Sequence, residues 1–115
     1  FQPTVLADVG TDMKISCEET FGPVAAVQPF TDEAEVVRRA NATEYGLVAY
    51  LFTRHNGRVL RVSEQLEYGM VAVNTVKITG APIPFGGVKQ SGLGREGGRQ
   101  GIEEFTELKY VCMAS

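Results

Sequence analysis

Glycine is concentrated in one stretch near the end of the chain, residues 84–98, with the sequence PFGGVKQSGLGREGG. This stretch, called the glycine loop below, holds six of the 13 glycines. Such a density predicts backbone conformations or close approaches that a side chain would forbid. A flexible linker would lack the larger side chains found here, which are Phe85, Lys89, Arg95 and Glu96. We therefore expect a shaped loop that lines a site or locks against a neighbouring segment. A tightened connection without chemistry is the alternative.

The 115 residues suffice for one small domain or a piece of one. Hydrophobic residues make up 43% of the chain, and the formal net charge is −3. We expect no nucleic-acid partner, because basic residues are not in surplus. We also expect no membrane association, because no apolar run approaches the roughly 20 residues that cross a bilayer and no signal or transit segment opens the sequence.

The cysteines and the histidine show no metal-ligand or redox spacing. Cys17 and Cys112 lie far apart, which favours two free thiols in a reducing compartment, the cytoplasm. Cys17 is a poor candidate for a nucleophile, because Glu18 and Glu19 directly after it would oppose ionisation of its thiol. His55 has no second ligand near it in the sequence and is interpreted as a surface residue. No metal site is predicted.

Apolar runs alternate with amphipathic segments, which predicts an α/β fold: a parallel sheet with helical crossovers. Near-continuous apolar runs are typical of strands covered on both faces. Segments whose apolar residues recur at helical spacing predict helices. The predicted strands are residues 4–7, 24–27, 45–53 and 70–73, and the predicted helices cover residues 32–41, 59–66 and 99–105.

Helix-end signals accompany these helices. Thr31 precedes a segment rich in Asp and Glu, which are favoured at a helix N-terminus, and it is the predicted N-cap of the first helix. Asn56 is the predicted cap of the second helix. Gly69 stands where a left-handed C-terminal cap is expected to end that helix.

Two further segments are predicted to be extended. In residues 15–30, alternation of side chains would point Glu19 and Phe21 to the same side. Residues 106–113 alternate two kinds of face at the end of the chain. A strand with two usable faces is free to join the sheet of another subunit.

Four short sequence elements occur in order: EETFGP at residues 18–23, YGL at 45–47, VN at 73–74, and the glycine loop. With these elements the chain resembles the C-terminal part of the NAD(P)-dependent aldehyde dehydrogenases, over essentially its whole length. Within that family it is most similar to the succinate-semialdehyde dehydrogenases, because of the glycine loop and the ending GIEEFTELKYVC. Enzymes for other short semialdehydes, such as glutarate semialdehyde, carry nearly the same loop.

The resemblance implies the C-terminal part of a catalytic domain over residues 1–105 and an oligomerisation strand over residues 106–115. It further implies NAD or NADP as cofactor, a small aldehyde substrate, and a homodimer or homotetramer. Family members oxidise the aldehyde through a thiohemiacetal on a cysteine, with a glutamate as the base for hydrolysis. Nothing in this chain matches that cysteine or glutamate. No catalytic residue is assigned, and the chain is expected to be inactive without the rest of its polypeptide.

Four residues match cofactor-binding or substrate-binding positions of the family. Glu19 matches a carboxylate that binds the nicotinamide-side ribose, and Phe21 matches an aromatic beside the nicotinamide ring. A solvated glutamate and a core phenylalanine are the alternatives. Thr79 and Phe85 match positions at the aldehyde entrance. Succinate-semialdehyde enzymes commonly have a serine at the Thr79 position, so the additional methyl narrows the pocket and leaves the chain length of the substrate open.

Other matching residues concern assembly and proton transfer. Arg95 matches an arginine that braces the subunit interface, and Glu107 matches a carboxylate that can pair with it. Glu96 matches a glutamate near the catalytic channel, either a proton relay or a structural partner. Leu47 borders the space of the nicotinamide ring next to Phe21 or belongs to the core, and Lys77 is interpreted as a solvated loop residue.

Two other interpretations differ in class. One is a free-standing interaction module that has lost the chemistry, in which a ribose-binding Glu19 would have no use. The other is an intact small nucleotide-binding domain, which needs a phosphate-binding glycine motif between a strand and a helix early in the chain. No such motif is present there. The isolated chain is also expected to expose apolar surface, because both faces of its strands have the character of buried surfaces.

Overall fold

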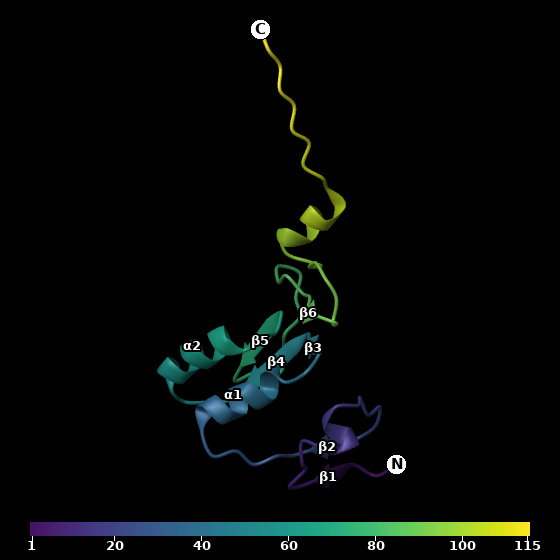
Figure 1. Cartoon of the computed structure of the whole chain (residues 1–115), viewed down its shortest axis with the longest axis vertical. Coiled ribbons are helices and arrows are strands. Elements are labelled where there is room, and N and C mark those ends of the chain that lie inside the picture. The colour runs from purple at the N-terminus through teal and green to yellow at the C-terminus, as the bar shows by residue number, and fades with distance from the viewer. The chain divides into compact units, whose positions relative to one another are not determined.

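A computed structural model describes residues 1–115, and the chain forms two compact units, residues 1–43 and 44–115. Figure 1 colours the first unit purple to blue and the second blue-green to yellow. Each unit contains a parallel strand pair, as predicted for an α/β fold. The predicted boundary between a catalytic part and an assembly strand at residue 106 stays a prediction. No helix has both the length and the apolar character needed to span a bilayer.

The first unit is built on one parallel strand pair. β1 (Thr4–Leu6) pairs with β2 (Val24–Ala26), and the short 3-10 helix η1 (Lys14–Ser16) lies between them in the sequence. The prediction that the chain is extended from Ile15 onward was therefore wrong at its start. The amide of Ser16 donates to the carbonyl three residues earlier at 2.9 Å, so a local turn satisfies this group without a neighbouring strand.

The helix of the first unit, α1 (Glu33–Asn41), starts with a different cap from the predicted one. Asp32 is the N-cap, and its Oδ1 accepts a hydrogen bond from the amide of Glu35 at 2.8 Å. An ionised cap suits the positive end of the helix dipole. Thr31 lies one residue outside, and its hydroxyl and amide donate to Oε2 of Glu35 at 2.6 and 2.9 Å. These bonds, with Arg39 beside the carboxylate, lower the pKa of Glu35.

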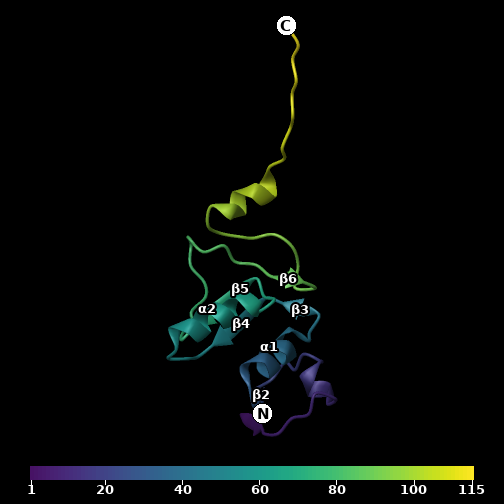
Figure 2. The same cartoon turned by 60° about the vertical axis from the view of Figure 1, so that its left-hand side comes forward.

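The second unit contains a strand, a helix and a parallel strand in succession. These are β4 (Val48–Leu51), α2 (Asn56–Gln65) and β5 (Met70–Val73), and the two strands pair along their whole length. Figures 1 and 2 both show α2 lying along this pair. Val62 of α2 and Ala72 of β5 are each only 5% exposed. The predicted helical crossover between parallel strands is confirmed.

A third strand pair was not predicted. Residues 45–53 were expected to form one strand, but β3 (Tyr45–Gly46) precedes β4 separately and pairs antiparallel with β6 (Val88–Lys89) of the glycine loop. The change of partner is fixed at Gly46, whose amide donates to Oγ of Ser91 at 2.9 Å. The glycine loop is therefore hydrogen-bonded to the short strand that precedes β4.

The ends of α2 also differ from the predictions. His55, which is exposed as expected, holds the N-cap position in place of Asn56, and no side chain caps the first turn. The C-cap is Leu66 in an extended conformation, and Gly69 is not left-handed. Gly69 has another role: a Cβ atom there would overlap the carbonyl oxygen of Gly86. Glycine is needed for the close approach of two backbones, not for a helix end.

The end of the chain consists of a short helix and a segment without secondary structure. The 3-10 helix η2 (Gln100–Phe105) confirms the predicted short helix, in a tighter form. Residues 106–115, called the tail below, follow as extended chain, yellow in Figure 1. An assembly strand there stays a prediction, because a strand is defined by a hydrogen-bonded neighbour. Four large apolar side chains of the tail are at least 68% exposed: Leu108, Tyr110, Val111 and Met113.

The apolar core is small. Four hydrophobic residues are buried, namely Val9, Val37, Val62 and Ala72. Many larger apolar side chains lie on the surface, including Phe21 at 95% and Phe105 at 86% exposed. Such an amount of exposed apolar surface marks contact regions in a soluble protein. The expectation that this chain exposes apolar surface is confirmed.

Candidate functional site

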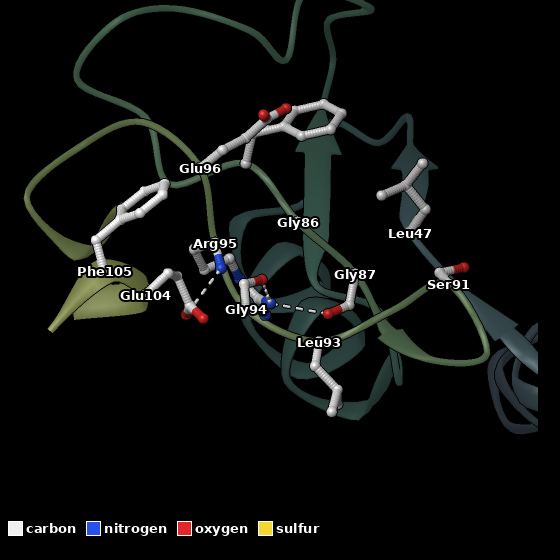
Figure 3. Close-up of a pocket in the computed structure, with 11 residues that line it drawn as sticks. Leu47, Gly86, Gly87, Ser91, Leu93, Gly94, Arg95, Glu96, Glu104 and Phe105 are labelled. Carbon is white, nitrogen blue, oxygen red and sulfur yellow. Dashed lines mark hydrogen bonds between the residues drawn. The ribbon is translucent and has the colours of Figure 1, made fainter. Parts of the chain in front are cut away.

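An open hollow of about 390 Å³ is formed by the glycine loop together with η2 and the residue that joins β3 to β4 (Figure 3). It lies entirely within the second unit. The structure brings together here four residues that the sequence had singled out for different reasons: Leu47, Phe85, Arg95 and Glu96. This convergence makes the hollow the candidate functional site.

Phe85 and Glu96 are fixed opposite each other. The amide of each donates to the carbonyl of the other at 2.8 Å, which makes an antiparallel bridge between the two ends of the glycine loop. A residue pair that exchanges both hydrogen bonds has a defined register. The half-buried aromatic and the exposed carboxylate therefore come from different parts of the loop but cannot slide past one another.

The Arg95 guanidinium braces the loop from inside. Its Nη1 donates to the carbonyls of Gly87 at 2.8 Å and Gly94 at 2.7 Å, as the dashed lines in Figure 3 show. It forms no ion pair with Glu107, which is exposed on the tail of the same chain. The predicted pairing of Arg95 with Glu107 is thus not seen within this chain, and the interface role of both residues stays a prediction.

The backbone of the loop confirms the prediction of a shaped segment. Gly97 illustrates the constraint: its φ is +73°, and a Cβ atom there would lie 2.8 Å from the carbonyl oxygen of Ile83. Both the conformation and the lack of space make any other residue unfavourable at this position. The left-handed glycines of the loop are Gly92, Gly94, Gly97 and Gly98.

The other predicted site residues lie outside the hollow. Thr79 is exposed in the segment between β5 and the glycine loop and does not line the hollow with Phe85. Glu19 and Phe21 belong to the first unit, between η1 and β2, and both are exposed. Phe21 is not part of the core that these 115 residues form. The binding roles of these residues stay predictions.

Two polar residues of the hollow were missed by sequence reasoning. Ser91 accepts the Gly46 amide and so joins the loop to β3. Glu104 of η2 accepts the amide of Arg95 on Oε1 at 3.2 Å. No local signal distinguishes Glu104 from its neighbour Glu103, because the difference arises only from the tertiary contact.

The charged and thiol groups outside the hollow make contacts within the protein that are typical of structural roles. Lys89 of β6 pairs with Glu67, Nζ to Oε2, at 2.7 Å, which ties the glycine loop to the turn before β5. The thiol of Cys17 is exposed and donates to the carbonyl of Lys14 at 3.4 Å. No group of three or more His, Cys, Asp or Glu side chains is arranged to hold a metal ion.

Comparison with known proteins identifies the family. Residues 1–111 match the aldehyde dehydrogenase family. The chain belongs to that family. Over 113 residues this aldehyde dehydrogenase chain is 62% identical to the 3-sulfolactaldehyde dehydrogenase of Pseudomonas putida and 55% identical to the NADP(+) succinate-semialdehyde dehydrogenase of Escherichia coli. Each match covers 98% of this chain and 23% of the relative.

Solved structures give the same result for the fold. The crystal structure of succinate-semialdehyde dehydrogenase from Burkholderia pseudomallei matches with a TM-score of 0.93 and 56% identity, over all of this chain and 24% of that one. An aldehyde dehydrogenase of Mycobacterium tuberculosis complexed with NAD+ matches with a TM-score of 0.85 and 40% identity, over 92% of this chain and 22% of that one. The chain thus has the aldehyde dehydrogenase fold and spans about a quarter of the length of these relatives.

Proposed function

We propose that this chain is the C-terminal part of an NAD(P)-dependent succinate-semialdehyde dehydrogenase, which oxidises succinate semialdehyde to succinate. The observation that carries the proposal is the hollow at the glycine loop, where Phe85 and Glu96 are held together in a chain of this family. The nucleophile and the general base come from the rest of the polypeptide. The 115 residues alone are therefore expected to be inactive.

Glu19 and Phe21 hold the nicotinamide end of the cofactor in this proposal. Their chemistry fits the group: an ionised carboxylate accepts hydrogen bonds from ribose hydroxyls, and an aromatic ring that is 95% exposed offers a bare apolar face. When bound, NAD or NADP accepts the hydride that leaves the aldehyde carbon. Glu19 anchors the sugar, and Phe21 limits where the nicotinamide ring can lie.

Phe85 and Thr79 select the aldehyde. Phe85 supplies an apolar wall, and the exposed Thr79 hydroxyl donates a hydrogen bond to an anionic group at the far end of the substrate. Succinate semialdehyde carries a carboxylate there. A second candidate is 3-sulfolactaldehyde, which carries a sulfonate, because this chain is 62% identical to an enzyme named for that substrate.

The tail completes the assembly in this proposal. Pairing of residues 106–115 with another subunit gives a homodimer or homotetramer, and Arg95 and Glu107 brace the interface. Exposure of apolar side chains on both faces of the tail supports this role. The two exposed free thiols, Cys17 and Cys112, suit the reducing conditions of the cytoplasm.

The test is an assay of the purified full-length polypeptide for cofactor reduction. Succinate semialdehyde, 3-sulfolactaldehyde and uncharged butanal are each supplied with NAD and with NADP. We expect kcat/KM for succinate semialdehyde to exceed that for butanal by at least about tenfold. Absence of cofactor reduction with every aldehyde would refute the proposal, and a preference for 3-sulfolactaldehyde would put the second candidate first.

Thr79→Val isolates the role of the hydroxyl, because valine has nearly the same shape. We expect the preference for succinate semialdehyde over butanal to fall by about fivefold, the value of one lost hydrogen bond. Thr11→Val is the matched control, because Thr11 is an exposed turn residue of the first unit. Equal preferences in both variants and the unmodified enzyme would remove Thr79 from the substrate site.

A further inference from the structure

Glu104 connects η2 to the glycine loop through the main chain. Its Oε1 accepts a hydrogen bond from the Arg95 amide at 3.2 Å, and Figure 3 shows the carboxylate turned toward this backbone. The Arg95 guanidinium does not take up this carboxylate, since it donates to the carbonyls of Gly87 and Gly94. Glu104 therefore holds a backbone amide and does not act as the counter-ion of the guanidinium.

Gly94 leaves room for this carboxylate. Its φ is +83°, and a Cβ atom there would lie 2.7 Å from both Cδ and Oε2 of Glu104. Any side chain at this position would displace the carboxyl group. The carboxylate is thus fitted against bare backbone on one side and bonded to the next amide along the chain.

The hydrogen bond between Glu104 and the Arg95 amide lies one residue away from the Phe85–Glu96 bridge. Arg95 is followed directly by Glu96, which exchanges two hydrogen bonds of 2.8 Å with Phe85. A shift of the Arg95 amide must move Glu96, and the bridge carries that movement to Phe85. Glu104 and Phe85 both line the hollow, so the path from one to the other is short.

We infer that Glu104 is a positioning residue for the aldehyde entrance: its carboxylate holds the backbone at Gly94 and Arg95, and through the Phe85–Glu96 bridge it sets the place of the Phe85 ring. This inference rests on the proposed function, which puts Phe85 at the entrance. A charged acceptor suits the task, because its hydrogen bond to an amide is about twice as strong as that of a neutral acceptor.

The test compares Glu104→Ala and Glu104→Gln in the full-length enzyme. Glu103→Ala is the matched control, because Glu103 is the neighbouring glutamate of η2 and is exposed like Glu104, but does not accept the hydrogen bond from the Arg95 amide. We expect Glu104→Ala to raise KM for the aldehyde about fivefold, as for one lost hydrogen bond, with KM for the cofactor changed by less than about twofold. Glu104→Gln keeps an acceptor oxygen, so its KM for the aldehyde should lie between those of the unmodified enzyme and Glu104→Ala.

Hydrogen exchange of the amides provides a second readout that needs no activity. In Glu104→Ala, the amides of Arg95 and Glu96 should exchange faster, while those of β4 and β5 stay unchanged. An unchanged aldehyde KM, an equal rise of both KM values, or an equal effect of Glu103→Ala would overturn the inference. Should the alanine variant fail to fold, Glu104→Gln with wild-type KM and exchange would overturn it equally.

The same measurements distinguish a wrong proposed function from a wrong role for Glu104. If the unmodified enzyme oxidises no aldehyde, the proposed function is wrong, and the assignment of an aldehyde entrance falls with it. If the unmodified enzyme is active and the Glu104 variants behave like it, the proposed function stands and only the positioning role is lost.

Discussion

The glycine loop and the tail lie close together in the sequence and belong to the same unit, yet they satisfy their backbone in opposite ways. The loop bonds to β3, to itself and to the segment before it. The tail has no strand partner, and its apolar side chains face solvent on both sides. The loop therefore takes its shape from bonds within this chain, whereas the tail has no such support here, and its role as an assembly strand stays a prediction.

The glycine loop and the tail also differ in the residues that they contain. The loop has glycine where its backbone approaches other groups closely, and its Arg95 side chain donates to the backbone carbonyls of Gly87 and Gly94. The tail contains no glycine and alternates Leu108 and Tyr110 with Lys109 and Val111. We expect mutations in the loop to change folding and substrate affinity, and mutations in the tail to change association.

The largest effect is expected from Leu108→Ser combined with Tyr110→Ser in the full-length enzyme. If these side chains are buried in an assembly, their loss should weaken association by about 3–6 kcal/mol, which is at least about a hundredfold in the dissociation constant. Sedimentation at several protein concentrations measures the change. Lys109→Ser is the matched control on the opposite face. An unchanged oligomer in the double variant would show that the tail is not an assembly strand.

Gly69→Ala tests the close approach of the residue before β5 to the glycine loop. The new methyl group would overlap the carbonyl oxygen of Gly86, so one of the two backbones must move. We expect the free energy of unfolding to fall by about 1–3 kcal/mol, as in other overpacked sites. Gly22→Ala is the control, since nothing lies within 4 Å of its added methyl. Equal losses in urea unfolding would contradict a specific contact at Gly69.

Asn74 tests how the end of the β4–β5 pair is closed. Its side chain accepts the Thr53 amide and donates to the Thr53 carbonyl, both at 2.9 Å, and its φ is +54°. We expect Asn74→Ala to lower the free energy of unfolding by about 1–2 kcal/mol, because both bonds and a tolerated left-handed residue are lost. Asn74→Gly restores the backbone freedom but not the bonds, so it should be less harmful. If the two variants are equally stable, the φ angle contributes nothing.

The sequence predicted those features that depend on local pattern. Apolar runs located β4 and β5, helical spacing located α1 and α2, and glycine density marked the loop. Features decided by distant partners were missed: β3 separates from β4 because Ser91 and the glycine loop hold Gly46, and Gly69 meets Gly86 and does not cap α2.

The candidate site shows the same limit. Phe85 and Glu96 were singled out from the sequence, but their mutual bridge and the contact of Glu104 depend on the folded path of the loop. A glutamate in a short helix looks solvent-exposed in the sequence whether or not it reaches a backbone amide. Composition cannot make that distinction, since Glu103 and Glu104 are identical and adjacent.

The smallest expected effect concerns the first unit. Residues of the first unit itself supply the hydrogen bonds at the start of α1, whereas Phe21 of the same unit is exposed. The Thr31 hydroxyl and amide, and then Arg39, lower the pKa of Glu35 relative to the unfolded chain. A lowered folded-state pKa means that the ionised group stabilises the fold above the unfolded-state value of 4.5 and that this contribution is lost as pH falls through the folded-state pKa.

The stability difference between the unmodified protein and Glu35→Gln should therefore be largest near neutral pH and shrink on acidification. Denaturant unfolding of both, from about pH 7 to about pH 3, measures it, and Thr31→Val should weaken the pH dependence because the leading cause of the shift is removed. A difference that stays constant over this range would show that the Thr31 contact does not favour the ionised carboxylate, and that α1 is started by Asp32 alone.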